Sequence, residues 1–129
     1  MKSSEITPEF IRRKELADFY FDNYVKYSRK KKFQKASELL WGALNNVLYA
    51  IALKVYGIKL GKHHQIKEFI NKLSTDYQDP EIAKIYTESA EIIHANFYHD
   101  FLDEDAFKHH AKNVEKLIEK LVAILEDRL

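Results

Sequence analysis

Cysteine is absent from this chain of 129 residues, and glycine and proline occur only three times and twice. Without cysteine there is no disulfide, no thiolate nucleophile and no zinc site built on thiolates. This absence fits a reducing compartment, so we expect a cytoplasmic protein. Because no Gly- or Pro-rich segment divides the chain, we also expect one domain over residues 1–129, with a core of its own.

The chain also lacks an excess of charge and an uninterrupted long apolar run. Its 21 basic and 20 acidic side chains leave a net charge of +1, so any contact with RNA needs a local basic patch. The first ten residues contain no apolar core of a signal peptide, and the longest apolar run, residues 39–56, is interrupted by Asn45, Asn46 and Lys54. We therefore expect neither an export signal nor a membrane span.

The two prolines predict two helix starts, because each follows a side chain that can cap a helix. Thr7 precedes Pro8, and Asp79 precedes Pro80. Proline is tolerated at the first helical position, where its missing N–H would have been unpaired, and the Thr or Asp oxygen accepts a later N–H. The helices predicted from these starts cover about residues 8–31 and 80–100.

The segment LLWGALNNVLYAIALKVY, within a helix predicted over residues 33–56, is apolar on nearly every side. A helix that is apolar all round is covered all round, so we expect it at the centre of the fold. Gly42 inside it costs about 1 kcal/mol of helix propensity relative to Ala and indicates a close approach by a neighbouring backbone. The segment GIKLG, residues 57–61, is expected to end this helix.

Two further helices complete the prediction. A short one carries apolar residues on one face, at Ile66, Phe69, Ile70 and Leu73. The last one begins near Asp103, where acidic residues suit a helix N-terminus. It has an apolar seam with spacings of three and four residues, at Phe107, His110, Val114, Leu117, Leu121 and Ile124. Since no strand signal competes, the sequence predicts an all-α, up-and-down bundle of four long helices and one short helix.

The apolar surface of the central helix and the seam of the last helix exceed what four long helices need to cover one another. This surplus predicts a homodimer. The alternative is that the helix over residues 33–56 is the central helix of a monomer.

The segment IIHANFYHDFL, residues 92–102, mixes polar and apolar side chains and is the best candidate for a functional site. On a helix, His94 and Tyr98 lie one turn apart on one side, whereas Asn96, His99 and Asp100 cluster on another. Asp100 or Asn96 would orient the His99 imidazole, which exchanges a proton near neutral pH as general acid–base catalysis requires. The alternative is the polar border of an amphipathic helix, with His94 bonded to a neighbouring tyrosine.

Two segments, KASELLWGALNNVLYAIAL at residues 35–53 and IIHANFYHD at residues 92–100, together resemble the HEPN superfamily of α-helical domains, and most of all its archaeal PaREP-type branch. The resemblance extends from the second predicted helix to the last. It implies a bundle that dimerises and that is often encoded near a nucleotidyltransferase, in toxin–antitoxin or RNA-processing systems. It also implies that catalytic members are metal-independent ribonucleases, which pair an arginine with a histidine four to six residues later near the dimer interface.

The sequence departs from that catalytic pattern. Residues 92–94, where the arginine that pairs with His99 would stand, are Ile, Ile and His, and the arginines of the chain are Arg12, Arg13, Arg29 and Arg128. A guanidinium holds a phosphate with a fixed fork of donors, whereas a neutral imidazole offers one donor. We therefore expect a non-catalytic HEPN-like domain that binds RNA, a nucleotide or a partner protein such as a nucleotidyltransferase. Two alternatives remain: a ribonuclease in which His94 and His99, brought together by a dimer, act as acid and base, and a purely structural interaction module.

No bound metal or cofactor is predicted. His63-His64 and His109-His110 are adjacent pairs that point in different directions on a helix, unlike the i, i+4 pair of a helical zinc site.

The run RKKKFQK, residues 29–35, is the densest positive patch, with Arg29, Lys30, Lys31 and Lys32 in succession. Basic residues at a helix C-terminus complement the helix dipole and solubilise a turn. The functional alternative is a surface that contacts phosphates, with Tyr27 as a stacking surface.

Overall fold

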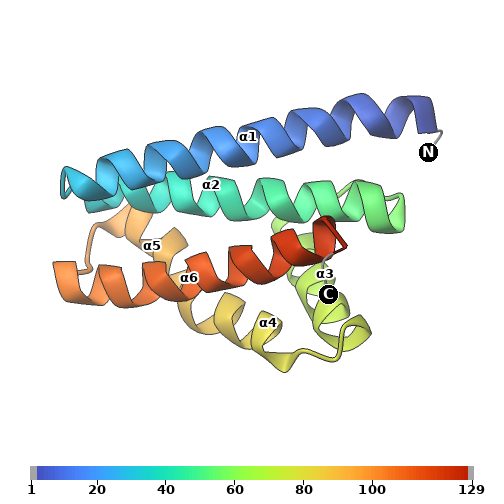
Figure 1. Ribbon diagram of the computed structural model, residues 1–129. Helices are drawn as coiled ribbons and strands as arrows, with labels where there is room; N and C mark the ends of the chain where they lie inside the picture. Colours follow the sequence, from blue (N-terminus) through green and yellow to red (C-terminus); the bar gives the residue numbers. More distant parts are fainter. Residues whose placement is uncertain (1–2, 128–129) are drawn as a thin grey trace.

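A computed structural model describes residues 3–127, and the surroundings of the side chains from Pro8 onward. Its helices, in chain order, are α1 (Ser3–Arg29), α2 (Phe33–Ile51), α3 (His63–Asp76), α4 (Pro80–Ile85), α5 (Glu91–His99) and α6 (Glu104–Leu125), as Figure 1 shows. Two π-helical turns, η1 (Ala52–Tyr56) and η2 (Tyr86–Ala90), extend α2 and join α4 to α5. The described part of the chain contains no strand, which confirms the all-α prediction.

With these turns included, the described residues form five helices, and the predicted bounds hold at most ends. Helix α2 with η1 covers Phe33–Tyr56, and α4, η2 and α5 together cover Pro80–His99. Helix α1 differs, because it begins at Ser3 and contains Pro8, which we placed at its start. Pro8 lies near the N-terminal end of α1, where its missing N–H removes few internal hydrogen bonds. The side chain of Thr7, the predicted cap, is outside the described residues.

The two acidic helix starts are confirmed. Asp79 precedes Pro80, and its carboxylate accepts a hydrogen bond from the backbone N–H of Glu81 at 3.2 Å. Asp103 accepts one from the backbone N–H of Ala106 at 2.8 Å. These carboxylates satisfy donors that a helix start leaves unpaired.

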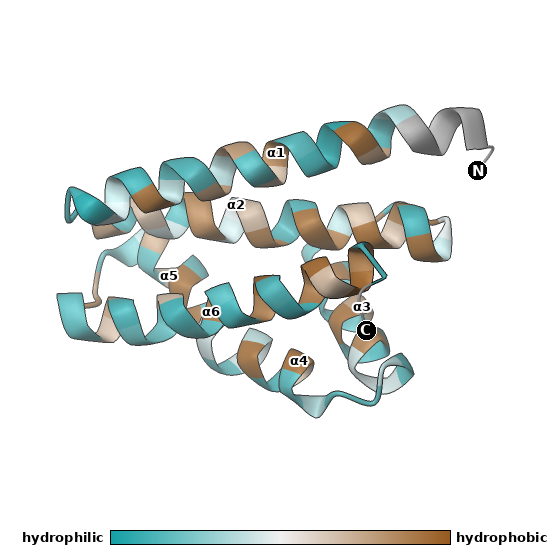
Figure 2. Ribbon diagram, in the orientation of Figure 1, coloured by the Kyte–Doolittle hydropathy of each residue, from teal (hydrophilic) through white to brown (hydrophobic). Residues whose placement is uncertain are grey.

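Helix α2 is the centre of the fold, as predicted. It is covered by α1 on one side and by α5 and α6 on others, and apolar segments recur along α2 and α6 while hydrophilic residues dominate α1 (Figures 1 and 2). The segment Phe33–Tyr56 is also long and apolar enough to cross a membrane, and 61% of its most apolar stretch is buried inside the bundle. A core helix meets the same criterion of length and composition, which is the part that α2 plays here.

Gly42 lies where α1 packs tightly on α2. A Cβ atom at this position would lie 3.2 Å from Cδ2 of the Tyr20 ring on α1. The prediction of a close approach is confirmed, but the neighbour is an aromatic side chain and not a backbone, because the flat ring of Tyr20 fills the space that a side chain at position 42 would take.

The apolar seam of α6 is covered within the chain. Its five apolar members are buried, and His110 is half-buried, with its Nδ1 atom 3.0 Å from the hydroxyl of Ser89. The surplus on α2 is covered as well, so the two surfaces that motivated a homodimer are occupied without a second copy. The homodimer stays a prediction, and light scattering tests it by measuring the molar mass in solution.

The stop after α2 depends on Gly57. Its φ of +67° lies in the left-handed region that favours glycine, whereas Gly61, at the other end of the same connection, is not in that region. We expect Gly57→Ala to lower the free energy of unfolding by about 1 kcal/mol more than Gly61→Ala, because only the first puts a Cβ into that conformation. Urea unfolding of both variants measures the difference, and equal effects would contradict this account of the helix end.

Candidate ligand-binding site

The segment IIHANFYHDFL forms the end of α5 and the loop that follows it. His94 is half-buried, Asn96 is fully buried, and Tyr98, His99 and Asp100 are exposed. Helix α5 ends where Asp100 adopts a left-handed conformation with φ of +46°. The three residues that we grouped as a catalytic cluster are therefore divided between the core and the surface.

Asn96 has a structural role. Its side-chain amide donates to the hydroxyl of Ser37 on α2 at 3.0 Å, and its carbonyl oxygen accepts from the backbone N–H groups of Phe101 and Leu102, both at 2.9 Å. These bonds tie the end of α5 to α2 and hold the loop that leads to α6. Within the chain, the side chains of His99 and Asp100 make no hydrogen bond or ion pair with any described residue, so nothing described here orients the His99 imidazole.

His94 instead lies in a group of rings. Its imidazole stacks on Trp41 of α2, with ring centroids 4.1 Å apart and planes 5° apart. The ring of Tyr98, one turn further along α5, packs edge-to-face with His94, and the two ring centroids are 5.2 Å apart. The ring centroid of His63 from α3 is 5.7 Å from that of His94. We call the set Trp41, His63, Tyr86, Glu91, His94 and Tyr98 the Trp41 cluster. His94 therefore meets a neighbouring tyrosine through ring contact, and its histidine neighbour within the chain is His63.

Polar groups of the Trp41 cluster lie around Glu91. Its Oε1 atom is 3.4 Å from Nε2 of His63, and its Oε2 atom is 3.8 Å from Nζ of Lys67. Tyr86 is buried beneath Trp41, with ring centroids 5.8 Å apart. Burial, and then the nearby Glu91 carboxylate, raise the pKa of Tyr86. The phenol therefore stays protonated at neutral pH.

Three buried polar atoms at this face lack a hydrogen-bond partner among the described residues. They are the Tyr86 hydroxyl, Oε1 of Glu91 and the side-chain oxygen of Asn45, which lies one turn from Trp41 on α2. No other buried side-chain N or O atom of the described part is unpaired in this way. Of these three, the Tyr86 hydroxyl and Oε1 of Glu91 have polar neighbours, since Glu91 acts on Tyr86 and its Oε1 is 3.4 Å from Nε2 of His63. The Asn45 oxygen is the one open to water or a ligand, because buried polar groups are normally satisfied.

The imidazole of His94 is neutral at neutral pH. Burial, and then the proximity of His63, lower the pKa of His94 below its usual value of 6.5, although Glu91 acts in the opposite direction. A neutral ring that is stacked on an indole offers a flat apolar surface and one N–H donor. It does not supply the fixed positive charge that an arginine supplies at any accessible pH.

The basic run lies at the same end of the bundle as the end of α5 (Figure 1). The side-chain amide of Gln34 donates to the backbone carbonyl of Phe97 at 2.9 Å, and Nζ of Lys31 is 3.5 Å from Glu104. In the described part of the chain, Arg29, Lys30 and Lys32 form no ion pair. The fold thus brings together two segments that sequence analysis selected separately.

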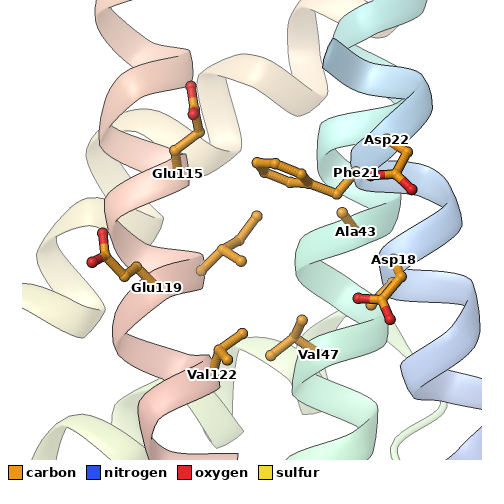
Figure 3. A pocket seen from close by; sticks show the side chains of 10 residues that line it. Asp18, Phe21, Asp22, Ala43, Val47, Glu115, Glu119 and Val122 are labelled. Atoms are coloured by element: carbon orange, nitrogen blue, oxygen red, sulfur yellow. The ribbon is translucent and has the colours of Figure 1, made fainter. Parts of the chain in front are cut away.

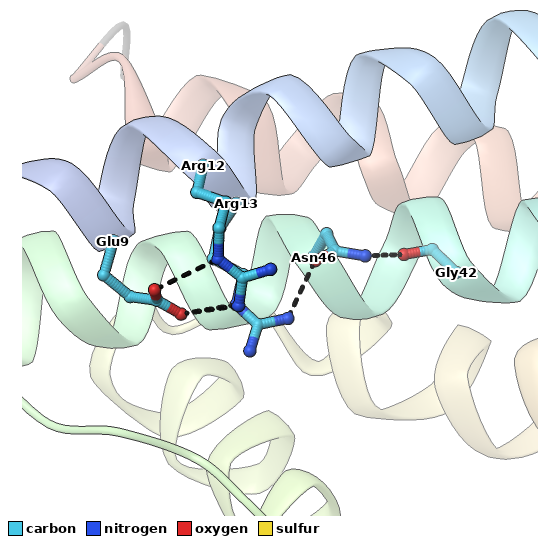
Figure 4. Close-up of polar contacts among 5 residues, drawn as sticks. All are labelled: Glu9, Arg12, Arg13, Gly42 and Asn46. Atoms are coloured by element: carbon cyan, nitrogen blue, oxygen red, sulfur yellow. Dashed lines mark hydrogen bonds and ion pairs between the residues drawn. The ribbon is translucent and has the colours of Figure 1, made fainter.

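The arginines are held away from the histidines. Both Arg12 and Arg13 bind the carboxylate of Glu9, and Arg13 also donates to the side-chain oxygen of Asn46 at 3.1 Å (Figure 4). The guanidinium carbon of Arg13 lies 4.3 Å from the centroid of the Tyr49 ring. No described arginine contacts a histidine, and Arg128 is outside the described residues.

The sequence alone did not point to Trp41, His63, Tyr86 and Glu91 as site residues. Glu91 precedes His94 by three residues on α5, but Trp41, His63 and Tyr86 lie on other segments, and no spacing in the sequence reports that they meet His94. The available signal was a tryptophan on the most apolar helix, which we assigned wholly to the core. Among the described residues, no three His, Cys, Asp or Glu side chains are gathered as metal ligands.

The structural role of Asn96 predicts the effect of its removal. Asn96→Ala leaves two backbone N–H groups without their acceptor, so we expect a loss of about 2–3 kcal/mol in the free energy of unfolding. Asn71 is exposed on α3 and provides the control, for which Ala should change stability by at most about 0.5 kcal/mol. Urea unfolding measures both, and a neutral Asn96→Ala would show that these bonds do not hold the loop.

Comparison with known proteins gives one match. No curated protein and no solved structure matches the chain. The family model of the archaeal PaREP1/PaREP8 family matches residues 12–118, a range that runs from α1 into α6 and includes the whole Trp41 cluster. The chain therefore belongs to the archaeal PaREP1/PaREP8 family.

Proposed function

We propose that this protein is a non-catalytic RNA-binding module of HEPN type, which binds single-stranded RNA by stacking bases on the Trp41 cluster. The observation that carries the proposal is the series of rings Trp41, His94 and Tyr98, whose outer member is 63% exposed. Stacking of a base on an aromatic side chain contributes about 1–3 kcal/mol and tolerates any base. Tyr98 offers the first surface for a base, with His94 and Trp41 behind it.

The unpaired Asn45 oxygen and the basic run supply the other contacts that RNA needs. A base that stacks at this face carries donors for the side-chain oxygen of Asn45, which has no partner among the described residues. Arg29, Lys30 and Lys32, at the end of the bundle where α5 ends, provide positive charge for phosphates. This local patch is what a chain of net charge +1 requires in order to bind RNA.

We propose a protein without catalytic activity because the Trp41 cluster lacks the fixed positive charge that stabilises a developing oxyanion. The specific observation in favour of the ribonuclease alternative is the pair His63 and His94, whose ring centroids are 5.7 Å apart and whose first member lies beside Glu91. Such a pair is able to exchange protons as acid and base. The pair His94 and His99, expected across a dimer, stays a prediction.

Binding is tested with a labelled oligouridine and fluorescence anisotropy. We expect Tyr98→Ala to weaken binding roughly tenfold, since it removes one stacking surface. Phe19 is the matched control, because it is an aromatic residue with 60% exposure on α1, and Phe19→Ala should leave the affinity unchanged. The single tryptophan, Trp41, lies in the site, so its fluorescence should change on binding. Equal losses in the two variants, or unchanged Trp41 fluorescence, would argue against the site.

Catalysis is tested with end-labelled RNA in EDTA, which excludes contaminating metal-dependent nucleases. We expect no cleavage by the wild-type protein, because no described arginine reaches the histidines. Cleavage that is lost in His99→Ala would support His94 and His99 as the catalytic pair. Cleavage that is lost only in His63→Ala and His94→Ala would place catalysis in the Trp41 cluster. Circular dichroism of each variant verifies that it remains helical.

The same proposal includes the partners that the resemblance to HEPN implies, a second copy of the chain and a nucleotidyltransferase, and a role in a toxin–antitoxin system. Large apolar side chains that stay exposed in the described part are available for such contacts, namely Ile11, Phe19, Val55, Ile58, Tyr98 and Phe101. Tyr98 and Phe101 are among them, so a dimer at that end would place the two RNA sites next to each other.

A further inference from the structure

A groove with acidic rims runs along α2 between α1 and α6, and we call it the acidic groove. It is a cavity of about 370 Å³ whose floor is apolar and includes Phe21, Ala43, Val47 and Val122. Asp18 and Asp22 of α1 stand on one side, and Glu115 and Glu119 of α6 stand on the other (Figure 3). All four carboxylates are on exposed residues.

The acidic groove is closed at one end and continues at the other. The hydroxyl of Tyr24 on α1 donates to Glu115 on α6 at 2.8 Å and joins the two helices there. In the opposite direction a second hollow shares Val47 with the first and reaches Ala50 on α2, where Lys14 and Glu126 also line it. The segment of α2 from Ala43 to Ala50 is about 10 Å long at 1.5 Å per residue, which is about two helical turns.

The acidic groove is distinguished by four carboxylates that face one another across one apolar hollow and form no ion pair with a described residue. An acid without an ion pair is not unusual in the described part of the chain, since exposed Glu68, Glu88 and Asp105 form none, whereas acids such as Glu9, Asp79 and Glu104 do. Asp18, Asp22 and Glu119 form none, and Glu115 binds only the neutral hydroxyl of Tyr24. Like charges that face one another without counter-charges destabilise the free protein, so this arrangement favours a cationic occupant.

The sign of the charge excludes several occupants. RNA phosphates and anionic lipid headgroups are repelled by the four carboxylates. A two-fold dimer through this face would place the same acidic rims against each other, because both subunits use the same patch. A metal ion or polyamine carries positive charge but no apolar side chains that would pack on the apolar floor. Positive charge and apolar side chains on one molecule describe a basic amphipathic segment of a polypeptide.

We propose that the acidic groove docks an amphipathic helix of a partner protein, with an apolar stripe flanked by lysines or arginines. The rim carboxylates are four residues apart on each side, at 18 and 22 and at 115 and 119, which is one helical turn. Basic residues four apart on the docked helix match that spacing. The stripe of the docked helix inserts over Ala43 and Val47, where small side chains leave the floor open.

The probe is a labelled synthetic helical peptide with leucines on one face and lysines on both flanks, and its counterpart has glutamates in place of the lysines. We expect the lysine peptide to bind saturably, more weakly as salt increases, and the glutamate peptide not to bind. The triple variant Asp18→Asn, Asp22→Asn and Glu119→Gln should weaken binding roughly tenfold, because it removes three ion pairs. Amide NMR shifts should map the peptide to Ala43 and Val47.

The matched control is a second triple variant with the same change in net charge, Glu68→Gln, Glu88→Gln and Asp105→Asn, at exposed acids elsewhere on the surface. It should bind the lysine peptide as the wild type does. The rim variant should also resist urea better than the control, since it relieves repulsion across the groove. Absence of saturable binding, or equal weakening by both triples, overturns the proposal. Self-association in light scattering that only the rim variant abolishes would replace the partner helix by a second copy of the chain.

Discussion

Because α2 is apolar on nearly every side, every other layer of the protein has to cover part of it. Helices α1, α5 and α6 pack on it directly, and the buried side chains of η2 and α6 complete the core around it. Burial of apolar surface contributes about 25 cal/mol per Å², so the placement of these helices follows from the surface they cover. The close contact of Tyr20 with Gly42 fixes how near α1 approaches, and the spacing that results leaves the acidic groove open towards α6.

Polar residues inside this apolar framework fix the alignment of the helices. Ser37 on α2 accepts a hydrogen bond from Asn96 on α5, and Asn46 on α2 accepts one from Arg13 on α1. Ser89 accepts one from Asn113 on α6. A buried polar group costs free energy unless it has a partner, so each of these bonds disfavours a sliding of one helix against another. An exception, the side-chain oxygen of Asn45, lies on the face where we place the RNA site.

The surface divides into faces of opposite character, although the net charge is only +1. The face with the Trp41 cluster and the nearby basic run at the end of α5 offers rings and cations, whereas the acidic groove offers carboxylates over an apolar floor. Both faces use α2, on different sides of that helix. Such a division allows two different ligands to bind one small domain without competing for the same surface.

The helices, their approximate ends and the central place of residues 33–56 follow from the sequence alone. Those features depend on local signals, namely the periodicity of apolar residues, the caps at Asp79 and Asp103, and the left-handed Gly57. The predicted start of α1 at Pro8 was wrong, because α1 begins at Ser3 and a proline near a helix start does not have to be the first residue. The sequence also selected His94, Tyr98 and the basic run, but it grouped Asn96 with His99.

Which side chains meet depends on the tertiary structure. It stacked His94 on Trp41, brought His63 from α3 to the same group, and turned Asn96 into the core to hold the loop after α5. It also placed the carboxylates of α1 opposite those of α6, which are separated by about 100 residues in the sequence. The physical reason is that helical periodicity reports which face of a helix is buried, whereas the rotation and spacing of packed helices depend on side chains from all of them at once.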